Sequence, residues 1–194
     1  LRWGFLRDPG HLLGVEMVSV ECQPRRLQLD ATTARPLNHA YGCNGIITTL
    51  TMASATAVAW QQLVLEFNSW EHALAAAQQL PTSALLLNAL CLLEAAVARQ
   101  LPWPQGCPAA EGQSHRLLLL AAPDALPVLT AWLPELGAEL VWQAPQGQSR
   151  GLPLRELCWN HTTLHVRSRD AGYTYLQLLL PQPEGPTLEA TRAR

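Results

Sequence analysis

The sequence predicts an α+β fold in two parts, and two observations about its periodicity support this. The first part, residues 1–56, contains short segments of alternating apolar and polar residues without a helical pattern, which is typical of an antiparallel sheet. From Val58 onward, apolar strands alternate with amphipathic helices, and the order strand-helix-strand occurs twice. That order is typical of a ferredoxin-like split β-α-β sandwich. We therefore expect a second part at 57–181 and an irregular tail at 182–194.

The first part is expected to hold a β-hairpin and a further strand. Alternation predicts strands at 12–22 and 26–30, joined by a turn that contains Pro24. An irregular segment leads to an apolar, β-branched strand at 45–52. The small residues at 53–57 then form the expected connector between the two parts.

The second part is expected to begin with a strand at 60–67 and a helix at 69–80. Asn68 and Glu71 have the spacing of a capping box, which makes Asn68 the expected N-cap, and Pro81 ends the helix. The later elements follow from apolar runs and from the breaks at Pro123 and Gly137. They are a strand at 84–89, a short helix at 91–100, a loop at 101–114, a strand at 115–122, a helix at 124–136, a strand at 138–143, a helix at 152–167 and a strand at 173–180.

Composition and charge exclude several classes of partner. The 194 residues carry a net charge of −2, so nothing attracts the chain to nucleic acid or to an anionic membrane. The longest apolar run, 84–97, is interrupted by Asn88 and Glu94, so no transmembrane segment is expected. The N-terminus lacks the apolar core of a signal peptide. Five scattered cysteines without a C-x-x-C pair favour a reducing compartment, and we expect a cytoplasmic protein.

A glycine turn that opens into an apolar strand is the most informative motif. Gly42 and Gly45 lie three apart, and the β-branched residues Ile46 and Ile47 follow at once. Backbone without a Cβ at the entrance to a strand allows a flat or phosphorylated ligand to lie close. A hairpin turn with no ligand is the alternative interpretation of the same residues.

Two segments together resemble a known flavoprotein family. Residues 3–18 read as a loop and strand similar to the family pattern tRd…llgleVV, and residues 42–51 are similar to the following G-x-x-G-I-I-T strand. The family is that of the FAD-linked oxidases related to vanillyl-alcohol oxidase and to the glycolate oxidase flavin subunit, with an FAD-binding domain of the PCMH type. The first half of its glycine motif is replaced here by His39-Ala40-Tyr41.

The resemblance implies a cofactor, a reaction and a set of residues. Residues 1–56 would form the end of the FAD-binding domain, and 57–181 would form the substrate (cap) domain. Gly42, Gly45, Ile46 and Ile47 would contact the ADP part of FAD, and Arg7 would lie near the flavin edge. The implied reaction oxidises a 2-hydroxy acid or related alcohol by hydride transfer to flavin, with an unidentified electron acceptor. A surface ion pair is the alternative role for Arg7.

A second motif contains two histidines one helical turn apart. His161 and His165 would share a helix face at the spacing of H-E-x-x-H, but Thr162 replaces the glutamate. No further ligands are evident in the sequence, so we expect no metal site there. The segment 156–177 resembles the part of the cap domain that reaches over the flavin, and this implies that His161 acts as a base or holds the substrate carboxylate.

Differences from the family pattern bear on the expected substrate and on the expected affinity for FAD. Related 2-hydroxyglutarate dehydrogenases look as though they hold their substrate with an arginine and a lysine, where this chain has Thr162 and Tyr175. The sequence also lacks the family's Pro-Gly-Gly phosphate loop and its metal-binding histidine and acidic motif. We therefore expect a fragment that binds FAD weakly or not at all. A non-catalytic ferredoxin-like regulatory or assembly module, and a small zinc hydrolase using His161 and His165, are the alternatives.

Overall fold

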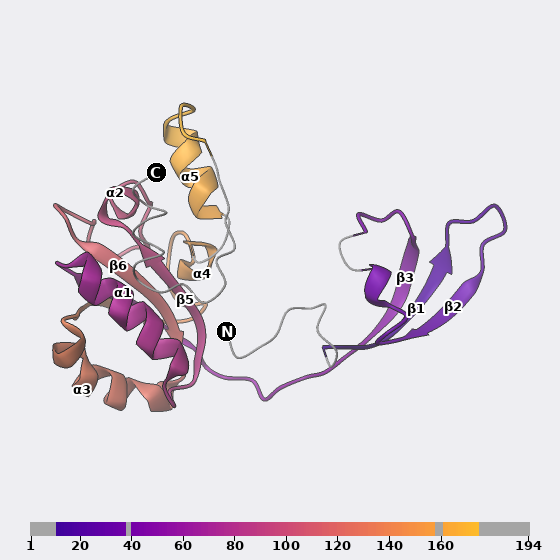
Figure 1. Cartoon of the computed structure of the whole chain (residues 1–194), viewed down its shortest axis with the longest axis horizontal. Coiled ribbons are helices and arrows are strands. Elements are labelled where there is room, and N and C mark those ends of the chain that lie inside the picture. The colour runs from indigo at the N-terminus through magenta and orange to yellow at the C-terminus, as the bar shows by residue number, and fades with distance from the viewer. Residues whose placement is uncertain (1–10, 38–39, 158–160, 175–194) are drawn as a thin grey trace. The chain divides into compact units, whose positions relative to one another are not determined.

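The chain divides into two compact units, each with its own antiparallel sheet (Figure 1). The computed structural model describes residues 11–37, 40–157 and 161–174. The division lies between Ala57 and Val58. The predicted α+β class with antiparallel sheets is confirmed.

The first unit is a three-stranded sheet in the order β2-β1-β3. Strand β1 (Leu12–Ser19) lies in the middle, and it pairs with β2 (Arg26–Asp30) and with β3 (Gly45–Met52). A 3-10 helix, η1 (Arg35–Leu37), follows β2 within the segment predicted to be irregular. One face of the sheet carries a small core of buried side chains, made by Val15, Met17 and Ala34.

The second unit contains a four-stranded sheet in the order β5-β6-β4-β7, and every neighbouring pair is antiparallel. Helix α1 connects β4 to β5 and helix α3 connects β6 to β7, which is the element order of a split β-α-β unit. The elements are β4 (Gln61–Phe67), α1 (Trp70–Gln79), η2 (Leu80–Thr82), β5 (Leu87–Leu93), α2 (Ala95–Ala98), β6 (His115–Ala121), η3 (Pro123–Ala125), α3 (Leu126–Leu136), β7 (Glu139–Pro145), α4 (Leu154–Leu157) and α5 (His161–Arg169).

Side chains on both faces of this sheet are buried, which explains why β4 and β6 have almost continuous apolar runs. Alternate residues of β4 such as Leu63 and Leu65 pack against α1 and α3. Val64, which points to the other face, packs with residues from α2, α4 and the loop at 99–114. The two cores therefore lie on opposite sides of one sheet.

Two local predictions in the second unit were wrong. The N-cap of α1 is Ser69 instead of Asn68, and the Ser69 side chain accepts a hydrogen bond from the backbone N–H of His72. The predicted helix at 91–100 is mostly absent, because Cys91 to Leu93 continue β5 beside β6 and only α2 is helical. An apolar run of this length is ambiguous between strand and helix until a neighbouring strand pairs with it.

The C-terminal predictions are partly outside the described residues. The single helix predicted at 152–167 is replaced by the short helix α4 and the separate helix α5. Thr162 Oγ1 donates to the carbonyl oxygen of Leu157 at the end of α4, 2.5 Å away. Tyr173 and Thr174 are not in a strand, and the rest of the strand predicted at 173–180 lies outside the described residues.

Candidate functional site

The glycine turn before β3 is a tight loop with two consecutive residues in left-handed backbone conformation. Tyr41 has φ 51° and Gly42 has φ 77°. The N–H of Cys43 donates to the carbonyl oxygen of Ala40 across the turn, at 2.9 Å. The Asn44 side chain donates to the carbonyl oxygen of Pro36, at 3.1 Å, and so ties the loop to η1. The turn therefore has a defined conformation before any ligand is considered.

The space around the missing Cβ differs between the two glycines of the turn. A Cβ at Gly45, where φ is 150°, would overlap Met17 Cε and the carbonyl oxygen of Val18 in β1. A Cβ at Gly42 would meet no atom within 4 Å. Packing of the sheet thus requires glycine at 45, whereas Gly42 presents bare backbone to open space.

Apolar side chains continue the open surface beside Gly42. Tyr41 is 93% exposed, Ile46 is 68% exposed and Ile47 is 46% exposed. Further along β3, Leu50 and Met52 are also about half exposed. Ile46 and Ile47 are consecutive residues of β3, so their side chains point to opposite faces of the sheet.

The remaining predicted site residues are less fully described. Arg7 lies outside the described residues. His161 is the first residue of α5, and its side chain lies outside the described residues. His165 follows one turn later in the same helix and is partly buried. These histidines belong to the second unit, whereas the glycine turn belongs to the first.

Among the described residues, no group of three or more His, Cys, Asp or Glu side chains could hold a metal ion.

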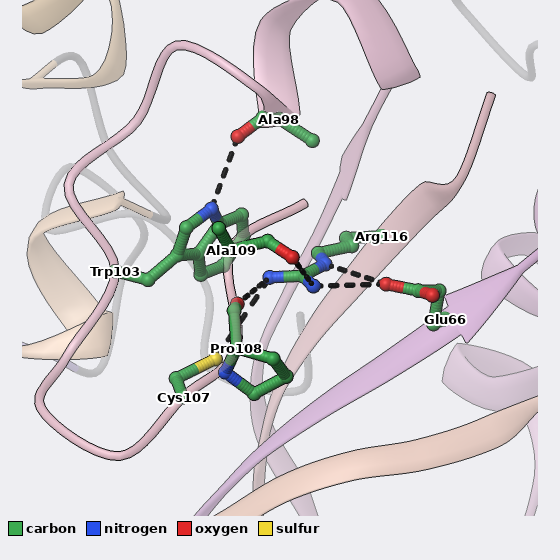
Figure 2. Close-up of polar contacts among 7 residues, drawn as sticks. All are labelled: Glu66, Ala98, Trp103, Cys107, Pro108, Ala109 and Arg116. Atoms are coloured by element: carbon green, nitrogen blue, oxygen red, sulfur yellow. Dashed lines mark hydrogen bonds and ion pairs between the residues drawn. The ribbon is translucent and has the colours of Figure 1, made fainter. Parts of the chain in front are cut away.

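A buried polar cluster around Arg116 was not anticipated from the sequence (Figure 2). Arg116 lies in β6, its side chain is 1% exposed, and Glu66 lies directly opposite it in β4. The guanidinium donates to Glu66 Oε2 through Nε at 3.0 Å and through Nη2 at 2.8 Å. It also donates to the carbonyl oxygens of Pro108 and Ala109, at 2.8 and 3.1 Å. One cation thus binds both the sheet and the loop at 99–114.

Trp103 and Cys107 complete this cluster from the same loop. The Trp103 ring lies 4.3 Å from the Arg116 guanidinium carbon, and its Nε1 donates to the carbonyl oxygen of Ala98 at 3.0 Å. Burial raises the pKa of the Cys107 thiol to about 11, although the nearby Arg116 charge and hydrogen bond act in the opposite direction. The thiol is therefore protonated at neutral pH and is a poor nucleophile.

The sequence carried a signal for this cluster. Glu66 and Arg116 are opposite charges at the ends of the apolar runs 63–65 and 117–122, and charges rarely lie in central strands unless they are paired. The partner carbonyl groups come from an irregular loop, so no spacing rule locates them. Because the guanidinium is enclosed, it holds the loop and is not itself accessible to a ligand.

Comparison with known proteins adds no assignment. No protein-family model matches the chain, and no curated protein matches its sequence. Of the helices within the described residues, none has the length and apolar character to cross a membrane.

Proposed function

We propose that the chain is part of an FAD-linked oxidoreductase that oxidises a 2-hydroxy acid or related alcohol. The observation that supports this most is the open backbone at Gly42 beside the exposed side chains of Ile46 and Ile47. This arrangement fits the ADP part of FAD, because the bare turn admits a pyrophosphate or ribose and the apolar strand covers a flat base. In the proposal Gly45 acts through the sheet, since its missing Cβ makes room for β1.

Each residue then has a defined task. Bound FAD would supply the acceptor for the hydride that leaves the substrate carbon. Gly42 would present backbone to the cofactor. The side chain of one of Ile46 and Ile47 would cover the adenine, and the other residue would contribute backbone hydrogen bonds, since neighbouring side chains in a strand face opposite ways. Arg7 would lie near the flavin edge. His161 would accept the hydroxyl proton on an imidazole nitrogen, so that the alcohol loses a proton and a hydride together.

The visible absorption spectrum tests this proposal. The protein is expressed with any coding sequence that lies upstream of Leu1, and the 194-residue chain alone is titrated with FAD in parallel. We expect a flavin spectrum from the longer protein that bleaches on addition of a 2-hydroxy acid, and weak or no binding to the shorter chain. A longer protein that is colourless and has no affinity for FAD contradicts the proposal.

Substitution of Gly42 tests the cofactor surface itself in that longer protein. Gly42→Val places a branched side chain over the open backbone, so the affinity for FAD should fall. Gly112→Val is the matched control, because Gly112 also has a positive φ (56°) and open space around its Cβ position. Equal FAD affinity in the two variants would remove Gly42 from the cofactor site.

A non-catalytic regulatory or assembly module is the second candidate. It is favoured by the burial on both faces of the four-stranded sheet, where α1 and α3 cover one face and α2, α4 and the loop at 99–114 cover the other. A sheet enclosed in this way does not need a cofactor to complete its core. The absence of any flavin-binding loop upstream in the gene would favour this candidate over the first.

A further inference from the structure

An open cavity of about 360 Å³ lies beside β7, the edge strand of the four-stranded sheet. Its lining consists of Trp142 and Ala144 of β7 and of two walls, Gln105 and the segment 148–150. Its volume is at the lower end of the range for small-molecule sites. All of its lining residues belong to the second unit, so the glycine turn contributes nothing to it.

The cavity wall is held by a buried amide. Gln62 is 1% exposed, and its Nε2 donates to Ser149 Oγ at 3.1 Å and to the carbonyl oxygen of Pro145 at 3.3 Å. Its Oε1 accepts from the backbone N–H of Leu154 at 3.1 Å. The backbone N–H of Gln105 donates to the carbonyl oxygen of Arg150 at 3.0 Å, which joins the two walls. These hydrogen bonds fix the Ser149 hydroxyl and the backbone of both walls, whereas the side chains of Gln105 and Arg150 are exposed.

Gly106 lies next to Trp142, one of the residues that line the cavity. Gly106 has φ 83°, and a Cβ there would lie 3.8 Å from Trp142 Nε1. Any longer side chain at 106 would reach toward the N–H edge of the indole. The positive φ of Gly106 itself favours glycine, and the distance of 3.8 Å to the indole is an ordinary contact.

The polar groups of the lining favour an anion. Arg150 is the charged residue among those that line the cavity, and no carboxylate lies among them. Arg150 forms no ion pair with any of the described residues. Its guanidinium has five donors in a fork that matches a carboxylate, and the neighbouring Ser149 hydroxyl and glutamine amides can donate as well.

We propose that this cavity binds a small carboxylate with an aromatic body. The Arg150 guanidinium would pair with the carboxylate, and the Trp142 ring would pack against the apolar part of the ligand. Ser149 Oγ, fixed by Gln62, would share the carboxylate. This site goes beyond the proposed flavin chemistry and does not require FAD.

Titration of the 194-residue chain with benzoate, followed by the indole N–H signals in ¹H–¹⁵N spectra, tests the proposal. The Trp142→Phe variant assigns the Trp142 signal, and benzyl alcohol serves as the neutral analogue of the probe. We expect the Trp142 signal to shift and saturate with benzoate, and benzyl alcohol to bind more weakly. Arg150→Gln should weaken benzoate binding about tenfold, because a hydrogen bond to a charged group is lost, and Arg150→Lys should weaken it less.

Arg35→Gln is the matched control, because Arg35 is an exposed arginine of the first unit and its substitution makes the same change in charge. Three results would overturn the proposal: a Trp142 signal that does not saturate, equal binding of benzyl alcohol, or equal effects of Arg150→Gln and Arg35→Gln. No sample contains flavin, so failure here leaves the oxidoreductase proposal untouched, and failure of flavin binding leaves this cavity untouched.

Discussion

At the scale of single residues, Arg116 shows how one buried charge organises an irregular segment. A guanidinium in a central strand is costly to bury unless all its donors are used. Here Glu66 neutralises the charge, and two carbonyl groups and a sulfur accept the other hydrogen bonds. The loop that supplies those carbonyl groups is consequently held against the sheet without regular secondary structure.

Arg116→Met should destabilise the second unit by about 3 kcal/mol, the lower end of the range for breaking a buried ion pair. The lower end is expected because the Glu66 side chain is 24% exposed and so remains partly hydrated. Urea unfolding followed by tryptophan fluorescence measures this change. Arg155→Met is the control, since Arg155 is an exposed arginine in the same unit and its loss should change stability by less than about 0.5 kcal/mol. Similar losses in both variants would show that the pair contributes little.

The Cys107 thiol should react slowly with iodoacetamide in the folded protein. With a pKa of about 11, only about one Cys107 in a thousand is a thiolate at pH 8. In urea the same thiol should titrate near its ordinary value of about 8.5 and react roughly 100-fold faster, as read by mass spectrometry of the peptide. The unfolded state therefore loses its proton first, so this thiol lowers stability as the pH rises from about 8.5 to 11. Equal rates in both states would contradict the burial.

At the scale of elements, the sequence predicts positions well where a local signal is present. The helix ending at Gly137 is confirmed, because glycine there has the left-handed φ of 67° that a C-cap requires. The predicted end of strand β5 was wrong, because pairing with β6 extends the strand through Cys91 to Leu93. The sequence predicted one motif that contains Gly42 and Gly45. It did not show that only Gly45 is packed against β1, because that contact arises from strand pairing and leaves no local pattern.

Substitution of the capping residue of α1 separates the predicted cap from the observed one. Ser69→Ala should destabilise the second unit by about 1 kcal/mol, because the N–H of His72 loses its acceptor. Asn68→Ala should leave stability nearly unchanged. Thermal unfolding of both variants provides the measurement, and a larger loss for Asn68→Ala would restore the capping box inferred from sequence.

At the scale of the whole molecule, the chain is two sheets joined by a connector. The sequence predicted this division from the change of periodicity near Val58 and the small residues before it. It did not predict the cavity beside β7, because the lining comes from a strand and two irregular segments that approach only after folding. Sites assembled from distant loops leave no spacing pattern in a sequence.

Limited proteolysis with elastase should cut first in the connector. Residues 53–59 have no regular secondary structure, are mostly exposed and include several alanines, which elastase accepts. The loop at 99–114 also lacks regular structure, but the hydrogen bonds that Arg116 makes to it should protect it. Mass spectrometry of the first fragments identifies the site. Initial cleavage inside that loop would show that the Arg116 contacts do not restrain it, and Arg116→Met should produce such cleavage.

Strand β3 has a consequence for handling the protein at high concentration. It runs from Gly45 to Met52 with no charged residue and no proline, and within the described residues β1 is its one strand neighbour. An uncharged edge strand with exposed isoleucines is a template for pairing with another chain. Turbidity of the 194-residue chain should therefore grow on concentration, and Leu50→Lys, which adds a charge to a half-exposed position, should keep the solution clear.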